Sequence, residues 1–238
     1  MRTKHCIVLC LLIGASWTAK ASGVPLPADA IKYIPVLQQT IASQWPNISR
    51  PELLAAQIEQ ESCASLKSKD CWNPNAELKT PYEYGFGLGQ LTIAYDSNHN
   101  VRFNNFTAMK QKYPSLKGWQ WDDRFDPKYQ MMTMVLMDKS AYGSVSWPVA
   151  SDNERLAFMF SGYNGGIGGV IQDRTLCVHT AGCDPSKWFG NVEKQSFKTK
   201  LTRPGYGQSA FAINRGYVTN IFTVRYQKYL PYFNKKAP

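Results

Sequence analysis

Helical periodicity, introduced by capping signals, constrains the fold of this 238-residue chain more than any other feature of its sequence. Ser49, Pro51 and Glu52 form a helix start, with the serine as N-cap, the proline at an early position and the glutamate completing a capping box. Residues at helical spacing then place an apolar face along 53–61. We therefore expect a helix that ends just after Glu61.

Further helices are expected for the same reason. An Asp-Pro pair opens one at 126–127, and a second capping box opens another at 151–154. The second of these ends in the glycine-rich run 165–169. A last helical segment spans about 211–229, with apolar and aromatic residues on one side.

The segments between these helices are rich in turn-forming residues. Residues 67–95 contain many Asn, Pro, Gly and Tyr residues and predict a small hairpin or only loops, and 98–121 and 177–208 resemble loop-rich insertions. The length suits one well-packed domain. We expect a mainly α single domain whose helices frame a loop-lined cleft, with little or no sheet.

The N-terminus has the pattern of a secretory signal peptide. Arg2 and Lys4 precede a short apolar stretch at 7–17, and Ala19-Lys20-Ala21 provides a small-x-small cleavage site. This predicts a signal peptide over residues 1–21 and a mature chain over 22–238. A retained membrane anchor is the other interpretation, but the apolar stretch is short for a membrane span.

Four cysteines lie beyond this leader: Cys63, Cys71, Cys177 and Cys183. Four cysteines in an exported protein suggest two disulfides, and we expect the pairs that are close in sequence, Cys63 with Cys71 and Cys177 with Cys183. A zinc site is the competing hypothesis, but no Cys-x-x-Cys or His-x-x-x-His spacing supports it.

The chain is strongly basic, with a formal charge of +10. Removal of residues 1–21 takes away three basic residues and no acidic ones, which leaves about +7. A basic protein is attracted to polyanions. An anionic cell wall or membrane surface fits an export signal better than nucleic acid does.

Most common catalytic motifs are missing from the sequence. It contains no Gly-x-Ser-x-Gly, no Walker loop and no His-Glu-x-x-His. His99 and His179, the two histidines beyond the leader, lie in expected loops with no evident Ser or Cys nucleophile beside them. If the protein is an enzyme, its acid–base chemistry should therefore come from a carboxylate.

Glu61 is the candidate for that carboxylate. It follows Ile58 by three residues and so shares the apolar face of its helix, where loss of hydration would raise its pKa. A proton kept near neutral pH is what a general acid needs. The alternative is a helix-end carboxylate paired with Lys or Arg. Glu59 lies on another face and is expected to be solvated.

Two further stretches accompany this helix end, YGFGLGQLT at 84–92 and FSGYNGG at 160–166. In order with Glu61-Ser62, they resemble the catalytic domain of lytic transglycosylases and goose-type lysozymes, glycoside hydrolase family 23 (SLT-like). Members have a Glu-Ser helix end, a Gly-Leu-Met-Gln loop and an Ala-Tyr-Asn-x-Gly helix end. The resemblance covers about residues 50–230 and implies a lysozyme-like α+β fold. Gly89 replaces the usual Met, and Gly162 the usual Ala.

The resemblance implies one catalytic residue and a set of saccharide contacts. Glu61 would protonate the oxygen between N-acetylmuramic acid and N-acetylglucosamine, then take the proton of the muramyl C6 hydroxyl, giving a 1,6-anhydro sugar. Ser62 would hydrogen-bond the substrate or seat Glu61, and Asn164 would contact N-acetyl groups or brace the loop; core packing is the other interpretation of Tyr163-Asn164. The residues implied to bind substrate are Ser62, Gly87, Leu88, Gly89, Gln90, Tyr163 and Asn164.

A second carboxylate near the loop would indicate hydrolysis instead. Goose-type lysozymes carry aspartates just before and just after this loop, where Pro81 and Thr92 stand here. Glu83 and Asp96 are close enough in sequence to substitute. We therefore favour a lytic transglycosylase over a hydrolytic muramidase. A peptidoglycan-binding protein without turnover is a third hypothesis, against which the intact Glu61 argues.

Four aromatic residues in expected loops are candidates for stacking on sugars, with local packing as the other interpretation: Tyr82, Tyr84, Trp119 and Trp121. No metal or organic cofactor is implied. The expected partner is the peptidoglycan glycan strand, in the periplasm or outside the cell. A wall-spanning secretion or conjugation apparatus is a further candidate partner, whereas nucleic acid and a stable membrane span after leader cleavage are not expected.

Overall fold

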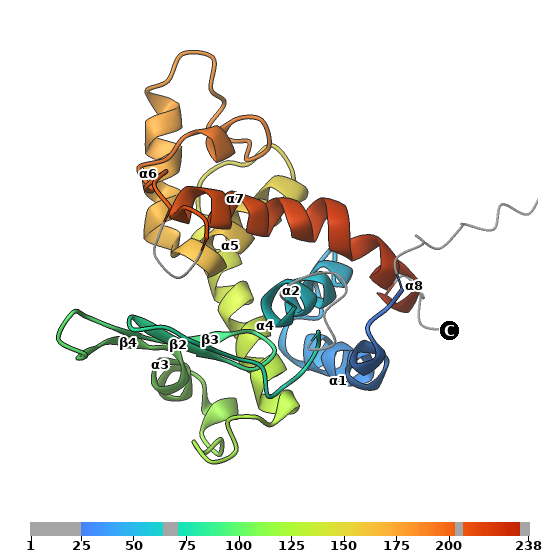
Figure 1. Cartoon of the computed structure of the whole chain (residues 1–238). Coiled ribbons are helices and arrows are strands. Elements are labelled where there is room, and N and C mark those ends of the chain that lie inside the picture. The colour runs from blue at the N-terminus through green and yellow to red at the C-terminus, as the bar shows by residue number, and fades with distance from the viewer. Residues whose placement is uncertain (1–24, 64–70, 203–206, 234–238) are drawn as a thin grey trace, which may run out of the picture.

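The computed structural model describes residues 25–63, 71–202 and 207–233 (Figure 1). The expected signal peptide therefore lies outside the described residues. Helices make up most of the described chain: α1 (Ala28–Gln44), α2 (Glu52–Ser62), α3 (Asn105–Lys112), α4 (Pro127–Ser144), α5 (Asp152–Gly165), α6 (Ile167–Val178), α7 (Ala210–Thr219) and α8 (Leu230–Phe233). The expectation of a mainly α chain is confirmed.

The start signals of two helices are confirmed. The Asp126 side chain caps α4 by accepting a hydrogen bond from the Lys128 amide, and the Ser151 side chain caps α5 by accepting from the Glu154 amide. The expected N-cap of α2 is wrong, because that helix begins after Pro51 and has no side-chain cap. Ser49 instead donates its hydroxyl hydrogen bond to the Asp152 carboxylate.

A small four-stranded antiparallel sheet agrees with the expectation of little sheet and extends beyond the small hairpin expected within 67–95. Its strands follow one another in space as in sequence: β1 (Glu77–Lys79), β2 (Glu83–Phe86), β3 (Leu91–Tyr95) and β4 (Val101–Asn104). The strands are only three to five residues long, so each is too short to show a clear period-two pattern. The presumed loop at 98–121 accordingly contains β4 and α3.

The C-terminal helix changes its winding as it crosses the molecule. Helix α7 continues into a π-helical turn at Asn220–Arg225, a 3₁₀ turn at Tyr226–Tyr229, and then α8. These turns pack against α2, so the C-terminal end of the chain covers the helix that carries Glu61. The helical segment expected at 211–229 is confirmed. Its π-helical and 3₁₀ turns were not predicted from the sequence.

The core forms where the helices cross. Helix α4 packs against α1 and α5, and α5 packs against α6 and α7. The main buried cluster joins these helices to α2, whereas a smaller aromatic cluster of Phe86, Phe106 and Trp119 lies beneath the sheet. Figure 1 shows the sheet with α3 at the lower left and α5, α6 and α7 above it. The sheet forms one wall and the α5–α7 helices form the other, and the groove described below lies between them.

Both expected cysteine pairs are confirmed. Cys63 is joined to Cys71, and Cys177 is joined to Cys183, with Cα–Cα separations of 4.3 and 5.3 Å. The first pair begins directly after α2, and the second joins Cys177, in the last turn of α6, to Cys183 beyond that helix. Within the described ranges, no helix combines the length and apolar character needed to cross a membrane.

Candidate active site

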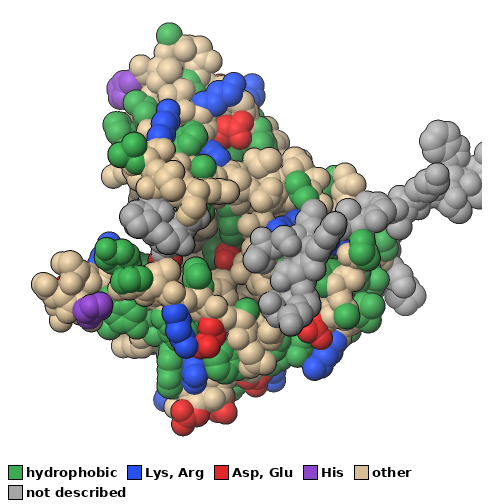
Figure 2. All heavy atoms as spheres, in the orientation of Figure 1, with side chains coloured by type: hydrophobic (Ala, Val, Ile, Leu, Met, Phe, Trp, Pro, Cys, Tyr) green, Lys and Arg blue, Asp and Glu red, His purple; other side chains and the backbone are tan. Residues whose placement is uncertain are grey.

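A groove runs between the sheet and the ends of α2 and α5. Two overlapping cavities, each of about 750 Å³, share Glu83, Thr92, Tyr163 and Asn164 in their walls. Glu61 lines the first cavity. Figure 2 shows the surface hollowed between the sheet side and the α5–α7 side, with acidic side chains visible inside. The fold therefore brings the three sequence motifs to one open groove.

Glu61 is the penultimate residue of α2 and lies at the groove. Its Oε1 accepts a hydrogen bond of 2.6 Å from the hydroxyl of Tyr217 on α7. Burial raises the pKa of Glu61 to about 8, and the Tyr217 hydrogen bond, which stabilises the carboxylate, opposes the rise. No ion pair to Glu61 forms within the part of the chain that the structure describes. Glu61 therefore holds a proton at neutral pH.

Two tyrosine rings shape the pocket around this carboxyl. The rings of Tyr163 and Tyr217 stack almost parallel, 5° apart, with centroids separated by 6.4 Å. Burial and the charge of Glu61 raise the pKa of both hydroxyls well above the ordinary range. Both therefore remain hydrogen-bond donors. Tyr217 contacts Glu61, whereas Tyr163 donates to the Gly89 carbonyl at 2.7 Å.

Glu59 contradicts the expectation of a solvated side chain. It is fully buried, and its carboxylate accepts hydrogen bonds from Arg225 at 2.9 Å, from Lys228 at 2.8 Å and from the Tyr229 hydroxyl. The cause is the C-terminal helix, which packs over the side of α2 that an amphipathic helix would expose to solvent. Glu59 and Glu61 thus differ in environment: two cations contact the first, whereas no Lys or Arg of residues 25–63, 71–202 and 207–233 forms an ion pair with the second.

Ser62 holds the chain that follows the acid. Its hydroxyl donates to the Ile58 carbonyl at 2.6 Å and accepts from the Trp72 amide at 2.7 Å. Together with the Cys63–Cys71 disulfide, these bonds tie the end of α2 to the segment after residue 71. The Ser62 hydroxyl is therefore engaged with the backbone on both sides, although the residue also lines the groove.

The Gly87–Gln90 loop forms the turn between β2 and β3. Gly87 has φ +76°, and a Cβ there would meet the Gln130 carboxamide at 2.3 Å. Gln130, on α4, accepts a hydrogen bond from the Leu88 amide at 2.9 Å. Gln90 donates its side-chain amide to the Gly87 carbonyl at 3.0 Å. Leu88 is fully buried, so of this loop only Gln90 lines the groove.

Gly89 allows a close approach between this loop and α5. A Cβ at this position would lie 2.8 Å from the Tyr163 hydroxyl, closer than a carbon and an oxygen can pack. The same hydroxyl donates to the Gly89 carbonyl. The glycine therefore lets the loop approach Tyr163, and the two residues connect the second motif with the third.

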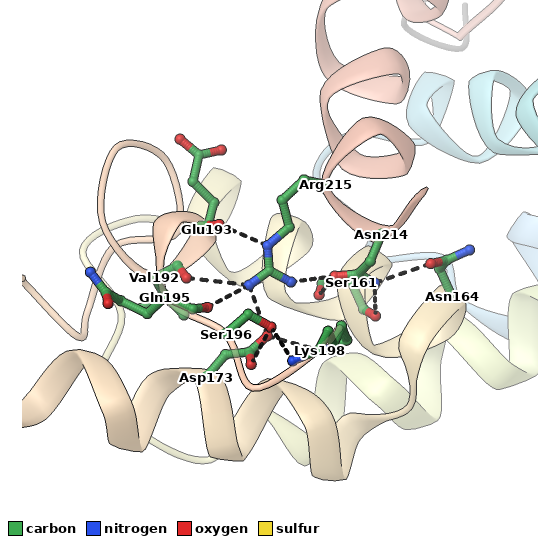
Figure 3. A network of polar contacts seen from close by, with 10 residues as sticks. All are labelled: Ser161, Asn164, Asp173, Val192, Glu193, Gln195, Ser196, Lys198, Asn214 and Arg215. Carbon is green, nitrogen blue, oxygen red and sulfur yellow. Dashed lines mark hydrogen bonds and ion pairs between the residues drawn. The ribbon is translucent and has the colours of Figure 1, made fainter. Parts of the chain in front are cut away.

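Asn164 is held by a polar network behind the groove wall (Figure 3). Asn214 on α7 donates to Asn164 Oδ1 at 3.1 Å and to the Ser161 carbonyl at 3.0 Å. The neighbouring Arg215 donates to Asn214 and forms an ion pair with Asp173 at 2.8 Å. This buried network ties α5, α6 and α7 together and fixes the orientation of the Asn164 side chain.

The two candidate second carboxylates lie in different places. Glu83 lies on β2 and lines both cavities of the groove. Asp96 lies in the turn between β3 and β4, where its carboxylate accepts hydrogen bonds from the amides of Asn98 and Asn100. It does not line either cavity. Of the two, only Glu83 can face a bound saccharide.

The four aromatic residues considered for stacking on sugars differ in burial and in position relative to the groove. Trp119 is fully buried and donates its indole N–H to the Asp123 carbonyl, so its stacking role is wrong. Trp121 packs on Phe86 and is 39% exposed. Tyr84 donates its hydroxyl to Glu77. Stacking on a bound sugar requires a ring that is exposed and that lines the groove. Of the four, Tyr82 alone meets both conditions.

Sequence reasoning gave no role to three residues near the site. Tyr217 was placed only in the last helix, and Gln130 was not considered. Asp138 is fully buried behind Glu61. A signal for Asp138 existed, because it follows Met134 by four residues and so interrupts the apolar face of α4. No group of His, Cys, Asp and Glu side chains suited to a metal ion occurs in residues 25–63, 71–202 and 207–233.

Comparison with known proteins adds no relative. No protein-family model matches the chain, and no curated protein matches it significantly. The function must therefore be inferred from the chemistry of the site.

Proposed function

We propose that the protein is an exported peptidoglycan lytic transglycosylase with a lysozyme-like fold. The observation that carries this proposal is Glu61, a carboxyl on the groove whose pKa burial raises to about 8 and which forms no ion pair with the described residues. Such a carboxyl is suited to donate a proton to a glycosidic oxygen at neutral pH. The groove supports a polymeric substrate, because it extends on both sides of the shared residues Tyr163 and Asn164.

The reaction begins with proton transfer from Glu61 to the oxygen that bridges N-acetylmuramic acid and N-acetylglucosamine. The bond from that oxygen to the muramyl C1 breaks, its electron pair stays with the oxygen, and an oxocarbenium-like C1 develops. The Glu61 carboxylate, now stabilised by Tyr217, accepts the proton of the C6 hydroxyl. The C6 oxygen then bonds to C1, which yields a 1,6-anhydro sugar and restores the protonated acid.

Tyr217 and Gly89 have distinct parts in this mechanism. The Tyr217 hydrogen bond stabilises the ionised form of Glu61 after proton donation. The hydrogen bond from Tyr163 to Gly89 holds the loop that presents Gln90 to the groove. Among the described residues, a neutral tyrosine hydroxyl rather than a cation contacts the acid, so Glu61 can both lose and regain its proton.

Hydrolysis by a muramidase is the second candidate, and Glu83 is the observation that favours it. This carboxylate lines the groove from the opposite wall, and a hydrolase would use a carboxylate in such a place to orient a water molecule toward C1. We rank it second because Glu83 is offset from the positions at which goose-type lysozymes carry their aspartates. A wall-binding protein without turnover ranks third.

Export is supported by the leader-like N-terminus and by the two disulfides. The basic charge suits an anionic wall. We propose the periplasm or the extracellular space as the location and the glycan strands of peptidoglycan as the partner. A wall-spanning secretion or conjugation apparatus is a further candidate partner.

The test is mass spectrometry of the muropeptides that the mature chain releases from purified peptidoglycan, with Glu61→Gln and Glu83→Gln alongside. Products lighter by one water than reducing muropeptides, absent with Glu61→Gln and retained with Glu83→Gln, would support the transglycosylase. Reducing ends that disappear with Glu83→Gln would identify a muramidase. No release by the folded wild-type chain, combined with binding to peptidoglycan, would leave the wall-binding role.

A further inference from the structure

A second buried carboxyl lies behind Glu61 and has no role in the reaction described above. Asp138 on α4 and Gln57 on α2 are both fully buried, and Gln57 Nε2 donates to Asp138 Oδ1 at 3.1 Å. Gln57 precedes Glu61 by one helical turn, and the charge of Glu61 acts on Asp138. Neither Gln57 nor Asp138 lines the groove. The pair therefore lies beside the acid without touching the substrate site.

The remaining oxygen of each group has no hydrogen-bond partner among the described residues. These atoms are Asp138 Oδ2 and Gln57 Oε1, and both are buried. No Lys or Arg of the described chain pairs with Asp138, since the cations that reach α2 from the C-terminal helix contact Glu59 and Gln60. An ionised Asp138 would thus be a buried charge with one hydrogen bond and no counter-ion, which is a costly arrangement.

One proton removes this difficulty. A carboxylic acid and a primary amide are complementary, because the acid O–H can donate to the amide carbonyl while the amide N–H donates to the acid carbonyl. A proton on Asp138 Oδ2 provides a donor for Gln57 Oε1 and closes such a cyclic pair. Burial raises the pKa of Asp138 well above its usual range; the Gln57 hydrogen bond opposes this rise, and the charge of Glu61 adds to it.

We propose that Asp138 is a positioning residue that stays protonated in a cyclic pair with Gln57, and that this pair gives Glu61 an uncharged backing. The titratable groups that act with Asp138 are Glu61 on α2, Tyr163 on α5 and Tyr217 on α7. An ionised Asp138 would repel the Glu61 carboxylate that proton donation leaves behind. A neutral Asp138 permits that carboxylate to form. The catalytic part of this proposal rests on the proposed function.

The protonation state can be measured without any activity. The chain would carry ¹³C at the aspartate side-chain carboxyls, so that Glu61 gives no signal, and would be titrated by NMR from pH 5 to 8. We expect one aspartate signal that keeps the chemical shift of a protonated carboxyl throughout and that disappears in Asp138→Asn. If every aspartate of the folded chain is ionised at pH 7, the proposal is overturned.

Kinetics then tests the link to Glu61. Asp138→Asn retains a cyclic amide–amide pair with Gln57, so we expect release of muropeptides to persist and the alkaline limb of its pH profile to stay in place. Asp138→Leu leaves the Gln57 amide unpaired, so we expect lower activity and a lower melting temperature. A folded Asp138→Asn whose alkaline limb moves down by about one unit or more would show that a charged Asp138 holds the Glu61 proton, and would overturn the proposal. If the wild type releases nothing, the proposed function fails while the NMR result still decides the state of Asp138.

Discussion

The raised pKa of Glu61 predicts that Glu61→Gln becomes more stable than the wild type as the pH rises. The folded chain holds the Glu61 proton up to a pKa of about 8, whereas an unfolded chain releases it near the ordinary value of 4.5. The stability that this proton contributes is complete below pH 4.5 and is lost progressively as the pH rises from 4.5 through 8. Glutamine does not titrate, so the variant lacks this loss.

The size of the effect follows from the separation of the two pKa values. Each unit of pKa difference corresponds to about 1.4 kcal/mol of unfolding free energy. The loss from Glu61 is about 3 kcal/mol at pH 7 and about 5 kcal/mol above pH 9. The quantity to compare is the unfolding free energy of Glu61→Gln minus that of the wild type. This difference should rise by about 3 kcal/mol from pH 4 to pH 7 and by about 5 kcal/mol from pH 4 to above pH 9.

The assay is urea denaturation at a series of pH values with the disulfides kept oxidised. Other titrating groups affect both proteins alike and largely cancel in the difference. Asp122→Asn is the matched control, because it makes the same carboxylate-to-amide change at an exposed position and should give no slope. Parallel curves for the wild type and Glu61→Gln would refute the claim that burial holds the proton on Glu61.

Three further predictions test other parts of the site. Tyr217→Phe removes a hydrogen bond that stabilises the Glu61 carboxylate, so the alkaline limb of peptidoglycan cleavage should move from about 8 to higher pH; an unmoved limb would contradict this assignment. Gly89→Ala should lower stability by about 1–3 kcal/mol and reduce cleavage. Gly143→Ala is the control, because its added Cβ meets nothing within 4 Å. Thermal denaturation should show a loss for the first variant and none for the second. Glu59→Gln leaves two buried cations without their carboxylate, so chemical denaturation should show a loss of about 3–5 kcal/mol, and a loss below 1 kcal/mol would refute the buried ion cluster.

The elements that sequence reasoning predicted correctly depend on local contacts. Asp126 and Ser151 cap helices by accepting hydrogen bonds from amides two and three residues away. The two disulfides join cysteines separated by eight and six positions. Such interactions depend on a few neighbouring residues, so the sequence pattern is enough to predict them.

Sequence reasoning expected at most a small hairpin within 67–95 and missed the full four-stranded sheet, because its strands are short and are stabilised by their pairing. Gly85 pairs with Thr92, and Glu83 with Ala94, across a turn at which Gln90 adopts a positive φ of 43°. The period-two signal over three to five residues is weak. What stabilises this sheet is the aromatic cluster beneath it, which includes Trp119 from a distant part of the chain.

Local sequence signals were enough to specify the framework of the site: the helix that ends just after Glu61, the disulfide that follows it, and the glycines that allow the loop at 87–90 to turn. The charge state of each carboxylate depends instead on how the helices pack. The C-terminal helix covers a second face of α2, so Glu59 is buried beside Arg225 and Lys228, which lie more than 160 positions later. Glu61 forms no ion pair with any described residue, lies at a partly desolvated groove and keeps its proton at neutral pH. Charge state depends on neighbours in space, and those neighbours are selected by how the helices pack.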